Sequence, residues 1–452
     1  MNILLILPKD RIYHYRGLLK NNIGYAPLTL TTLAGLVPEH LNAHVDIVDE
    51  GVQKPYYEAF YNDKKHYDLV GITCTASSSP RAYQLAVYFR KQGVFVVLGG
   101  SHPTLVPEEA AQYADSVIVG PGELTWPQLL TDYKNGETKK FYHHTGTDKC
   151  TLSMPVPRRD IQPKGLYMPI PTIIANRGCR NNCSFCTINH IYGSKSLYRP
   201  IEEVVSEIKQ LKSRKLLFLD PSPNSDKEYA KKFYEALIPL KVKWMGLSTM
   251  DIVYDRELFD LMVRSGCDGV LVGLESFTQA NNDESLKKLN DVKKYKEVVE
   301  IFHKNKVRIL GHFIIGFDND TKESIEEMLD IIDDIGIDLP RFTVLTPFPG
   351  TRLYERMKEE GRIITDDRAL YDTENVVFKP KNMSPLELQE LYHKIKKEAY
   401  SNKRIFKRSF STQGNKVLTL VANVGFRFLQ NDNVLLALFT NLGLKVYSRI
   451  LG

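Results

Sequence analysis

Strand-like and helix-like segments alternate along most of this chain, in two separate series. In residues 1–135, short apolar runs alternate with amphipathic stretches such as Pro80–Gln92, whose apolar residues repeat at helical spacing. Continuous apolar strands joined by helices favour a parallel sheet with helices on both faces. The expected fold class is therefore α/β, beginning with a doubly wound, Rossmann-like domain over 1–135. Its predicted strands are Ile3–Leu7, His44–Val48, Leu69–Cys74, Val94–Leu98 and Ser116–Val119.

The second series follows a connector, residues 136–170, that is rich in Lys, Thr and Pro. Its predicted strands alternate with helices such as Ile201–Leu211 and Ser324–Ile335. Parallel βα units of this kind predict a partial (β/α)6 barrel over 171–370, with reactive residues at the carboxyl ends of the strands. The strands are Thr172–Asn176, Leu216–Asp220, Trp244–Ser248, Gly269–Glu275, Arg308–Phe317 and Phe342–Pro347.

The alternation of strands and helices ends in the last part of the chain. Residues 371–452 are expected to form a mostly helical C-terminal domain. Pro385–Glu398 predicts an amphipathic helix, and the apolar stretches Val417–Leu429 and Val434–Leu442 are too short to span a bilayer. Residues 403–452 hold eight basic residues and one acidic residue, so this tail accounts for the formal net charge of +6. The tail is expected either to cap the barrel or to touch an anionic membrane surface.

The charge distribution and the N-terminus indicate where such a protein acts. Because the excess positive charge lies in the tail, the main body offers no basic platform, and nucleic acid is not an expected partner. The N-terminal sequence has no basic region and too short an apolar run for a signal peptide. We therefore expect a cytoplasmic protein, with peripheral contact at the inner face of the membrane if the tail binds lipid.

Three of the six cysteines lie close together, in the pattern Cys179-x3-Cys183-x2-Cys186. A [4Fe–4S] cluster usually takes four thiolates, so three would leave one iron open to bind another molecule. The alternative is a zinc site completed by His190 or by a distant cysteine. The scattered cysteines, typical of a reducing cytosol, are expected to be packing residues: Cys74, Cys150 and Cys267.

With the aromatic Phe185 just before the third cysteine, this loop resembles the cluster-binding loop of the radical S-adenosylmethionine (SAM) enzymes. In that family the open iron binds SAM, and reduction of the sulfonium releases a 5′-deoxyadenosyl radical that abstracts hydrogen from unactivated carbon. The resemblance implies a [4Fe–4S] cluster and SAM as cofactors. It also implies a flavodoxin- or ferredoxin-like electron donor.

The strand ends of the second series extend this resemblance. Residues 273–276 (GLES) resemble the fourth-strand motif whose glutamate contacts SAM, and 312–317 resemble the fifth-strand motif that packs adenine. Residues 346–351 match the family's sixth strand. Two positions have structural alternatives, because Glu275 could pair with a nearby arginine and Asp220 could cap the next helix. The SAM-binding set implied by the resemblance is Phe185, Asp220, Ser248, Glu275, Ile315 and Pro347.

Small and glycine-rich loops follow the strands of the first series, so backbone amides there can approach a ligand closely. Alone, this indicates a nucleotide-like ligand at the strand ends, although no full G-x-G-x-x-G motif is present. The order of residues from 99 to 123 resembles the cobalamin-binding domain that is fused to many radical SAM enzymes. The resemblance implies cobalamin contacts from Thr75, Ser77, Ser78, Gly100, Ser101, His102, Thr104, Gly120, Gly122 and Glu123.

One cobalamin motif is missing. Other cobalamin domains carry a cobalt-ligating D-x-H-x-x-G sequence, whereas three residues separate Asp10 from His14 in this chain. Many members of the fused family also lack the motif and leave the cobalt without a protein histidine. We therefore expect His14 to be an exposed loop histidine.

Over roughly residues 1–400 the chain resembles the cobalamin-dependent radical SAM enzymes, most closely the branch of the hopanoid methylases and the anaerobic bacteriochlorophyll cyclase. The resemblance implies methylation of an unactivated carbon in a lipid-like or natural-product molecule. The adenosyl radical would remove hydrogen, and methylcobalamin would deliver the methyl group. The cofactors would carry the hard chemistry while the protein positions and shields them.

Two alternatives remain at this stage. Cobalamin could serve a cyclisation, ring rearrangement or oxidation without methyl transfer. The chain could also be a non-catalytic iron–sulfur or corrinoid carrier. The carrier is disfavoured because it would not need a full set of SAM-like strand ends.

Overall fold

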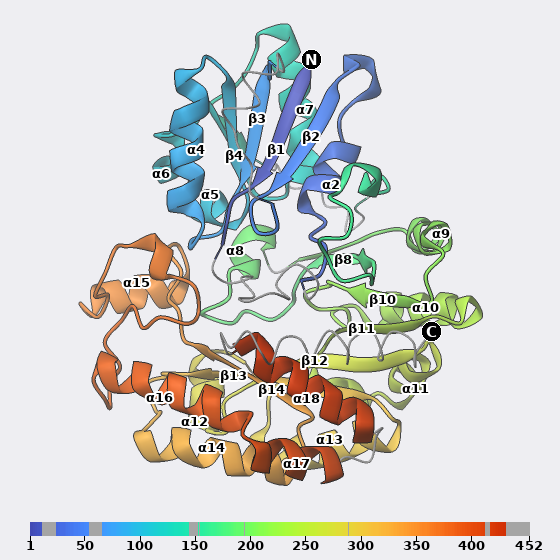
Figure 1. The fold of residues 1–452 in the computed structure, drawn as a ribbon, viewed down its shortest axis with the longest axis vertical. Helices are drawn as coiled ribbons and strands as arrows, with labels where there is room; N and C mark the ends of the chain where they lie inside the picture. Colours follow the sequence, from blue (N-terminus) through green and yellow to red (C-terminus); the bar gives the residue numbers. More distant parts are fainter. Residues whose placement is uncertain are drawn as a thin grey trace.

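The structure is a computed structural model that describes residues 1–10, 24–53, 66–143, 152, 154–193, 195–287, 289–411 and 416–430. It contains two six-stranded parallel sheets, one in each half of the chain, and a two-stranded hairpin. Figure 1 shows the N-terminal sheet at one end of the molecule and the second sheet toward the other, with strand β8 and helix α8 in between. The two predicted strand–helix series are confirmed as two separate sheets.

The N-terminal sheet has the strand order β2-β1-β3-β4-β5-β6, so the direction of winding reverses between β1 and β3. Such a reversal defines the ligand-binding edge of a doubly wound fold. Five strands match the predicted ones to within one residue at each end, whereas β6 was not predicted and lies in the expected connector. The strands are β1 Asn2–Leu7, β2 His44–Asp49, β3 Leu69–Thr73, β4 Phe95–Gly99, β5 Ser116–Val119 and β6 Phe141–His143.

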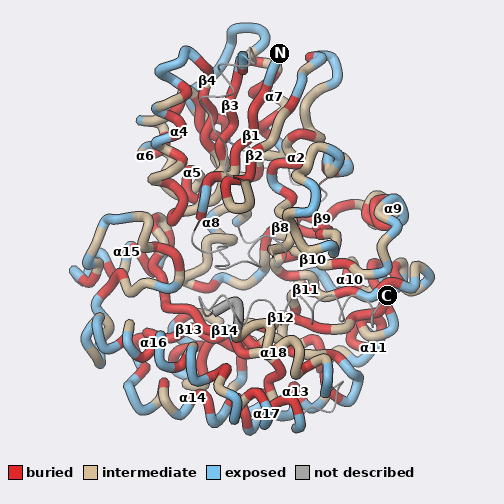
Figure 2. Tube along the Cα trace, viewed as in Figure 1, coloured by how far each residue is buried: buried red, intermediate tan, exposed pale blue. Residues whose placement is uncertain are grey.

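Helices cover both faces of this sheet because successive strand residues point to opposite faces. On β1, Leu4 and Ile6 pack on the side of helix α4, while Ile3 and Leu5 pack on the side of α2 and α7. All four side chains are fully buried, and Figure 2 shows the same burial along the central strands. The helices are α2 Thr29–Gly35, α4 Ser79–Lys91, α5 Ser101–Leu105, α6 Pro107–Ala111 and α7 Gly122–Asn135.

The second sheet is the predicted partial (β/α)6 barrel. Its strand order, β14-β13-β12-β11-β10-β7, follows the sequence, and every neighbouring pair is parallel. The strands are β7 Thr172–Ile173, β10 Lys215–Phe218, β11 Lys243–Ser248, β12 Cys267–Glu275, β13 Arg308–Ile315 and β14 Leu339–Val344. The helices are α9 Ile201–Leu211, α10 Lys227–Leu237, α11 Arg256–Arg264, α12 Gln279–Glu284, α13 Tyr295–Lys304, α14 Lys322–Ile335 and α15 Arg352–Glu359.

Two barrel strands differ from the sequence prediction by three residues at an end, whereas the other four differ by at most two. The last strand, expected at Phe342–Pro347, runs instead over Leu339–Val344. The first strand ends at Ile173, because the following residues form β8 (Asn176–Gly178), which pairs antiparallel with β9 (Ser196–Tyr198). This hairpin encloses the three-cysteine loop and the short helix α8 (Ile188–Tyr192).

The carboxyl ends of the two sheets are joined by direct contacts. Arg177, on β8, forms a 2.7 Å ion pair with Glu123 at the start of α7. The Thr172 hydroxyl donates a 2.8 Å hydrogen bond to the carbonyl of Ala26. Gly350, in the loop after β14, has a φ of +81°, and a Cβ there would lie 2.7 Å from the carbonyl oxygen of Leu105 on α5. The loops of the two domains therefore pack directly against each other.

The C-terminal helices pack on the barrel. They are α16 Pro385–Ala399, α17 Asn402–Ser411 and α18 Lys416–Gln430. Leu388, Leu391 and Ile395 of α16 belong to the same buried cluster as the barrel strands. This packing matches the helical-cap alternative for these three helices. The second apolar stretch, Val434–Leu442, lies outside the described residues.

Ion pairs with α14 compensate part of the positive charge of the tail. Arg408 is buried and its Nη1 lies 3.1 Å from Asp333 of α14, while Arg404 lies 2.9 Å from Asp330. The Arg408 guanidinium also donates to Asn423 of α18. Two of the eight tail charges are therefore neutralised by α14. Among the described residues, none of the helices combines the length and the hydropathy that crossing a bilayer requires.

Candidate active site

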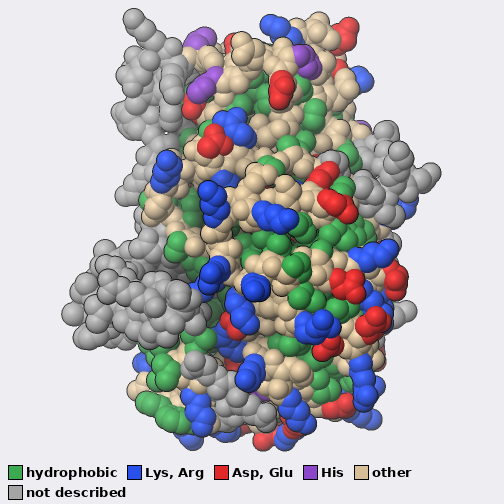
Figure 3. Space-filling view, turned by 90° about the vertical axis from the view of Figure 1, so that its right-hand side faces the viewer, with side chains coloured by type: hydrophobic (Ala, Val, Ile, Leu, Met, Phe, Trp, Pro, Cys, Tyr) green, Lys and Arg blue, Asp and Glu red, His purple; other side chains and the backbone are tan. Residues whose placement is uncertain are grey.

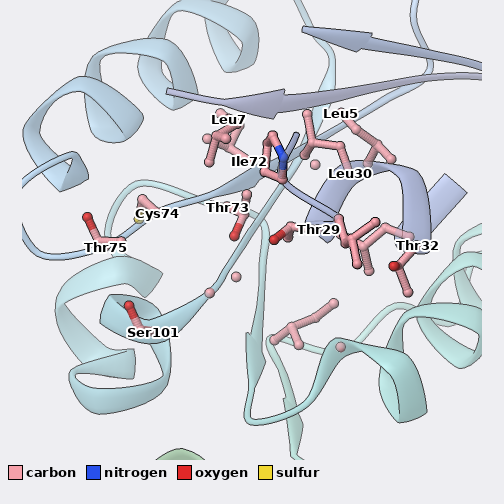
Figure 4. A pocket seen from close by; sticks show the side chains of 18 of the residues that line it. Leu5, Leu7, Thr29, Leu30, Thr32, Ile72, Thr73, Cys74, Thr75 and Ser101 are labelled. Atoms are coloured by element: carbon pink, nitrogen blue, oxygen red, sulfur yellow. The ribbon is translucent and has the colours of Figure 1, made fainter. Parts of the chain in front are cut away.

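A cavity of about 430 Å³ opens at the carboxyl ends of the N-terminal strands. Figure 4 shows Thr73, Thr75 and Ser101 at one end of this space, while Leu5 and Leu30 lie at the other, mainly apolar end, between β1 and α2, with Thr29 and Thr32 beside Leu30. Beside the reversal between β1 and β3, this is the place where doubly wound sheets bind their ligands. The barrel side contributes residues of the cysteine hairpin and of β10's end: Ile174, Arg177, Ile188, Ile191, Tyr192 and Leu219.

Gly71 keeps the apolar end of the cavity open. It lies in the middle of β3, and a Cβ at this position would come within 2.9 Å of Leu5 and 3.3 Å of Trp126. Gly71 is also one of the residues that line the cavity, so the missing side chain leaves room between the strand, Leu5 and Trp126. The cavity can therefore admit a bulky apolar group between the sheet and the helices on one face.

Seven of the ten residues predicted to contact cobalamin line this cavity: Thr75, Gly100, Ser101, Thr104, Gly120, Gly122 and Glu123. His102 is not among the lining residues, and its contact with cobalamin stays a prediction. Its ring is buried, and Nε2 lies 2.9 Å from Glu109 of α6. This hydrogen bond is the main cause that lowers the pKa of Glu109 to about 2. The hydrogen bond of His102 therefore joins α5 to α6.

Ser77 and Ser78 also lie outside the cavity lining, and they hold the shape of their loop instead. Ser78 Oγ accepts a 3.0 Å hydrogen bond from the Thr75 amide. Ser77 Oγ donates a 2.6 Å hydrogen bond to Asp10, which also accepts from the Thr75 hydroxyl. Asp10 is therefore a buried anchor of the 75–77 loop. His14 lies outside the described residues.

The three cysteines of the loop lie close enough for their charges to interact, and Cys183 is buried. Burial raises the pKa of Cys183 to about 11 and also raises that of Cys186. Iron would overturn this, because coordination deprotonates a thiol outright. Among the described residues, no three His, Cys, Asp or Glu side chains are placed to hold a single metal ion. A cuboidal cluster binds each thiolate through a different iron, so three spaced thiols on one loop fit it.

The cysteine loop is fastened to the barrel rather than free. The Ser184 amide donates to the Ser285 carbonyl (3.1 Å), and the Ser184 carbonyl accepts from the Leu353 amide of α15 (3.1 Å). Phe185 is half-buried, with its ring edge-on to Phe317 at 6.3 Å between centroids. In this structure Phe185 thus anchors the loop on the fifth-strand end.

Glu275 is the predicted SAM contact that the structure places most favourably. It ends β12 with a φ of +63°, which is unusual for a residue other than glycine, and a register irregularity precedes it. Its carboxylate forms a 2.8 Å ion pair with Lys287 and lies 3.3 Å from His312 Nδ1. Burial alone would raise the pKa of Glu275, but these two partners outweigh it and hold the value at about 2.

Lys287 is a site residue that the sequence analysis missed. Its side chain is largely buried, and its charge interacts with Glu275 and with the thiols of Cys183 and Cys186. It lies in a polar run, Asp283-Glu284-Ser285-Leu286-Lys287, that reads as solvated surface. The sequence signal was therefore weak. The structure brings this lysine and the glutamate of the GLES motif together beside the cysteine loop.

The Asp220 carboxylate has a structural role in this structure, and its predicted role in SAM binding stays a prediction. Its Oδ1 accepts hydrogen bonds from the backbone amides of Ala175 (2.6 Å) and Asn176 (2.8 Å), so it fixes the chain where β7 passes into β8. Ser248 is likewise engaged with Asn224 (3.1 Å). Both side chains are buried, and their hydrogen bonds stabilise the loops at the carboxyl ends of the barrel strands.

The structural role of Asp220 predicts a pH-dependent stability. Burial raises its pKa to about 6, so the folded state holds a proton that the unfolded state releases near pH 4. The stability gained from this proton is present below about pH 4 and is lost as pH rises through about 6. In Asp220→Asn, which keeps the accepting Oδ1, stability relative to wild type should rise by about 2–3 kcal/mol from pH 4 to 7. Denaturant unfolding at both pH values measures this, and a large loss of SAM affinity in this variant would contradict the role.

Ile315 and Pro347 are both buried. The Ile315 side chain is part of the barrel core, and its carbonyl accepts from the Leu345 amide (2.9 Å). Neither residue offers a free polar side chain to a ligand. If Ile315 and Pro347 contact SAM as predicted, they do so through backbone groups or by apolar packing.

Comparisons with known proteins agree with both halves of this site. Residues 173–332 match the radical SAM superfamily, and residues 24–130 match the B12 binding domain. Residues 351–449 match a domain of unknown function, DUF4070. A solved structure of the radical S-adenosylmethionine methyltransferase TsrM from Kitasatospora setae superimposes with a TM-score of 0.64 at 16% identity, covering 86% of this chain and 85% of that one. This likeness supports the fold.

Curated relatives place the chain more closely. The bacteriochlorophyllide d C-12(1)-methyltransferase of Chlorobaculum tepidum is 31% identical over 84% of each chain. The anaerobic magnesium-protoporphyrin IX monomethyl ester cyclase of Cereibacter sphaeroides is less similar, at 25% identity over 69% of this chain and 56% of its own. These relatives are enzymes, so the carrier alternative is not retained. The chain belongs to the cobalamin-dependent radical SAM methyltransferases, whose cofactors are a [4Fe–4S] cluster, SAM and cobalamin.

Proposed function

We propose that this protein methylates an unactivated carbon of a lipid-like or natural-product molecule held at the junction of its two sheets. The observation that carries the proposal is the shared cavity. It is lined by strand-end loops of the B12-binding half and by Arg177, Ile188 and Tyr192 of the cysteine hairpin. A methyl donor in one half and a radical source in the other would therefore face a common space.

The residues have separate tasks in this proposal. When bound, the cluster with SAM supplies a hydrogen-abstracting radical, and cobalamin supplies the methyl group. Cys179, Cys183 and Cys186 would hold the cluster. Glu275 is ionised and Lys287 is cationic, so the pair would bind the ammonium and the carboxylate of SAM's amino-acid end by charge-assisted hydrogen bonds.

An apolar substrate is supported by helix α8. Ile188, Ile191 and Tyr192 lie on the barrel side of the cavity and are partly buried. Such a surface excludes water from the reacting carbon and offers little to a strongly polar molecule. The Chlorobaculum tepidum relative acts, by its name, on bacteriochlorophyllide d, and a small molecule of similarly apolar character suits α8.

We also propose the cellular setting. A flavodoxin- or ferredoxin-like protein would supply the electron, and the enzyme would work in the cytoplasm. The C-terminal helices would touch the inner face of the membrane, where a lipid-like substrate is presented.

Comparative lipid and metabolite profiling tests the methylation. Cells that express the protein should contain a compound larger by one CH2 unit than its counterpart in cells that lack it. With deuteromethyl methionine, that compound should gain a CD3 group, and cells expressing Cys183→Ala should lack it. Oxidation of CH2 to C=O gives nearly the same mass change without label. An unlabelled product would therefore favour the cyclase-like alternative, which the Cereibacter sphaeroides relative keeps as the second candidate.

A further inference from the structure

Helix α17 buries a charged side chain and exposes aromatic ones, which is the reverse of an ordinary surface helix. Its buried side carries Arg408, whose side chain is 1% exposed, together with Ile405. Its solvent side carries Phe406, 53% exposed, and Phe410, 63% exposed. Single exposed apolar residues are common on protein surfaces and need no explanation. A buried charge next to exposed aromatic rings is unusual and indicates that the exposed rings have a role.

Ion pairs fix this orientation. Arg408 contacts Asp333 (3.1 Å) and Asn423 (3.0 Å), and its guanidinium also donates to the carbonyl of Ala399. Turning the helix to bury the phenylalanines would leave Asp333 in the interior without this partner, which is strongly unfavourable. The outward position of Phe406 and Phe410 is therefore built into the packing of α17 on α14 and α18.

The exposed side of α17 forms a small aromatic and basic surface, which we call the phenylalanine–lysine face: Lys403, Phe406, Lys407 and Phe410. The two rings lie one helical turn apart, with 6.1 Å between centroids and 12° between planes. Residues 402–410 include no Asp or Glu. Two acids on α14 are paired with arginines of α17: the buried Asp333 contacts Arg408, and Asp330, which is 80% exposed, contacts Arg404.

Some other lysines of the molecule are paired with acids. Figure 3 shows basic side chains along the middle of one side of the molecule, with acidic ones mostly toward its right-hand edge. Between α10 and α11, the ion pairs are Lys227–Asp255 (3.2 Å) and Lys231–Glu257 (2.5 Å). Within the described part of the chain, no such ion pair involves Lys403 or Lys407. These two charges remain available to an anionic partner.

We infer that the phenylalanine–lysine face docks on an anionic lipid surface, with its rings at headgroup depth and its lysines on the lipid phosphates. Aromatic residues with flanking lysines suit a membrane interface. A face of about two helical turns is smaller than the roughly 800 Å² per partner of a stable protein interface. Figure 1 shows α17 at the end of the barrel away from the N-terminal sheet, so docking leaves the cavity uncovered. The inference rests on the proposed function only for its purpose, which is to hold the enzyme close to the membrane that contains a lipid-like substrate.

Vesicle co-sedimentation of the full-length protein tests this face. The probes are phosphatidylcholine vesicles with and without phosphatidylglycerol, at low and high salt. Wild type should bind the anionic vesicles at low salt, and Lys403→Gln/Lys407→Gln should weaken this binding about twentyfold. Phe406→Gln/Phe410→Gln should weaken it at least about tenfold, because ring insertion is lost.

Matched controls separate this face from general charge and apolarity. Leu386→Gln changes an equally exposed residue, at 67%, at the far end of α16. Lys91→Gln/Lys134→Gln removes the same charge from the N-terminal domain. Both should bind as wild type does, and all variants should keep the iron content of wild type.

Three results would overturn the inference: no wild-type binding to anionic vesicles, unchanged binding by the phenylalanine variant, or a wild-type dimer that this variant dissolves. The last result would identify a second copy as the occupant. Binding is read without SAM, cobalamin or turnover. Absence of methyl transfer would therefore contradict the proposed function and leave this result standing.

Discussion

Replacing Cys183 with alanine is expected to abolish cluster assembly and SAM cleavage together. Cys183 is the buried thiol of the three-cysteine loop, and a cluster with one open iron needs all three thiolates. Iron content should fall to background, and the charge-transfer absorption at about 400 nm should disappear. Anaerobic reconstitution followed by iron analysis and chromatography of the SAM products measures both.

Cys267→Ala is the matched control. Its thiol is also buried, but it lies on β12 and points to the Gly269 carbonyl rather than to the loop. This variant should keep its iron and SAM cleavage while losing about 1–2 kcal/mol of stability. One zinc per chain and no iron after anaerobic reconstitution of wild type would support the zinc alternative instead.

Replacing Gly71 with valine is expected to eliminate cobalamin binding and to spare the cluster. The new side chain would enter the apolar end of the cavity, where a Cβ alone comes within 2.9 Å of Leu5. The cavity would close from the side of β3, whereas the cysteine loop lies in the hairpin of β8 and β9. Cobalamin titration by absorption spectroscopy should show no binding, while iron content and SAM cleavage stay at wild-type levels.

Val70→Leu controls for overpacking in the same strand. Val70 is fully buried but faces α4, on the side of the sheet away from the cavity. This variant should retain cobalamin at a stability cost of about 1–3 kcal/mol. If Gly71→Val bound cobalamin as tightly as wild type, this cavity would not be the cobalamin site.

The strands were predictable where the sequence gives a continuous apolar run, and not elsewhere. The central strands β1 and β3 are such runs, whereas β6, β8 and β9 have three residues each and no usable pattern. The last barrel strand begins and ends three residues earlier than predicted. In the structure Pro340 lies within β14, an edge strand, where a missing amide donor is tolerated.

The site was predictable where its residues are close in sequence. The spacing of the three cysteines falls on one loop, and Glu275 belongs to a short motif at a strand end. The resemblance to the cobalamin-binding domain locates a loop but not the direction of its side chains, and the ring of His102 contacts Glu109 in this structure. Lys287 was missed because its partner lies on another element.

In the tail, too, the sequence does not show which residues pair across different helices. Its positive charge and apolar stretches are evident from sequence, but the burial of Arg408 against Asp333 depends on how α17 packs on α14. Sequence periodicity would place the phenylalanines of α17 inside. Only the tertiary ion pairs explain why they face solvent.

The central claim is that one enzyme combines radical formation with methyl transfer from cobalamin. The most direct test is to count 5′-deoxyadenosine and S-adenosylhomocysteine per product, using reconstituted enzyme and an extract that contains the substrate. Methyl transfer predicts equal amounts of the two, both of them lost in Cys183→Ala. Formation of 5′-deoxyadenosine and product without S-adenosylhomocysteine would contradict the account.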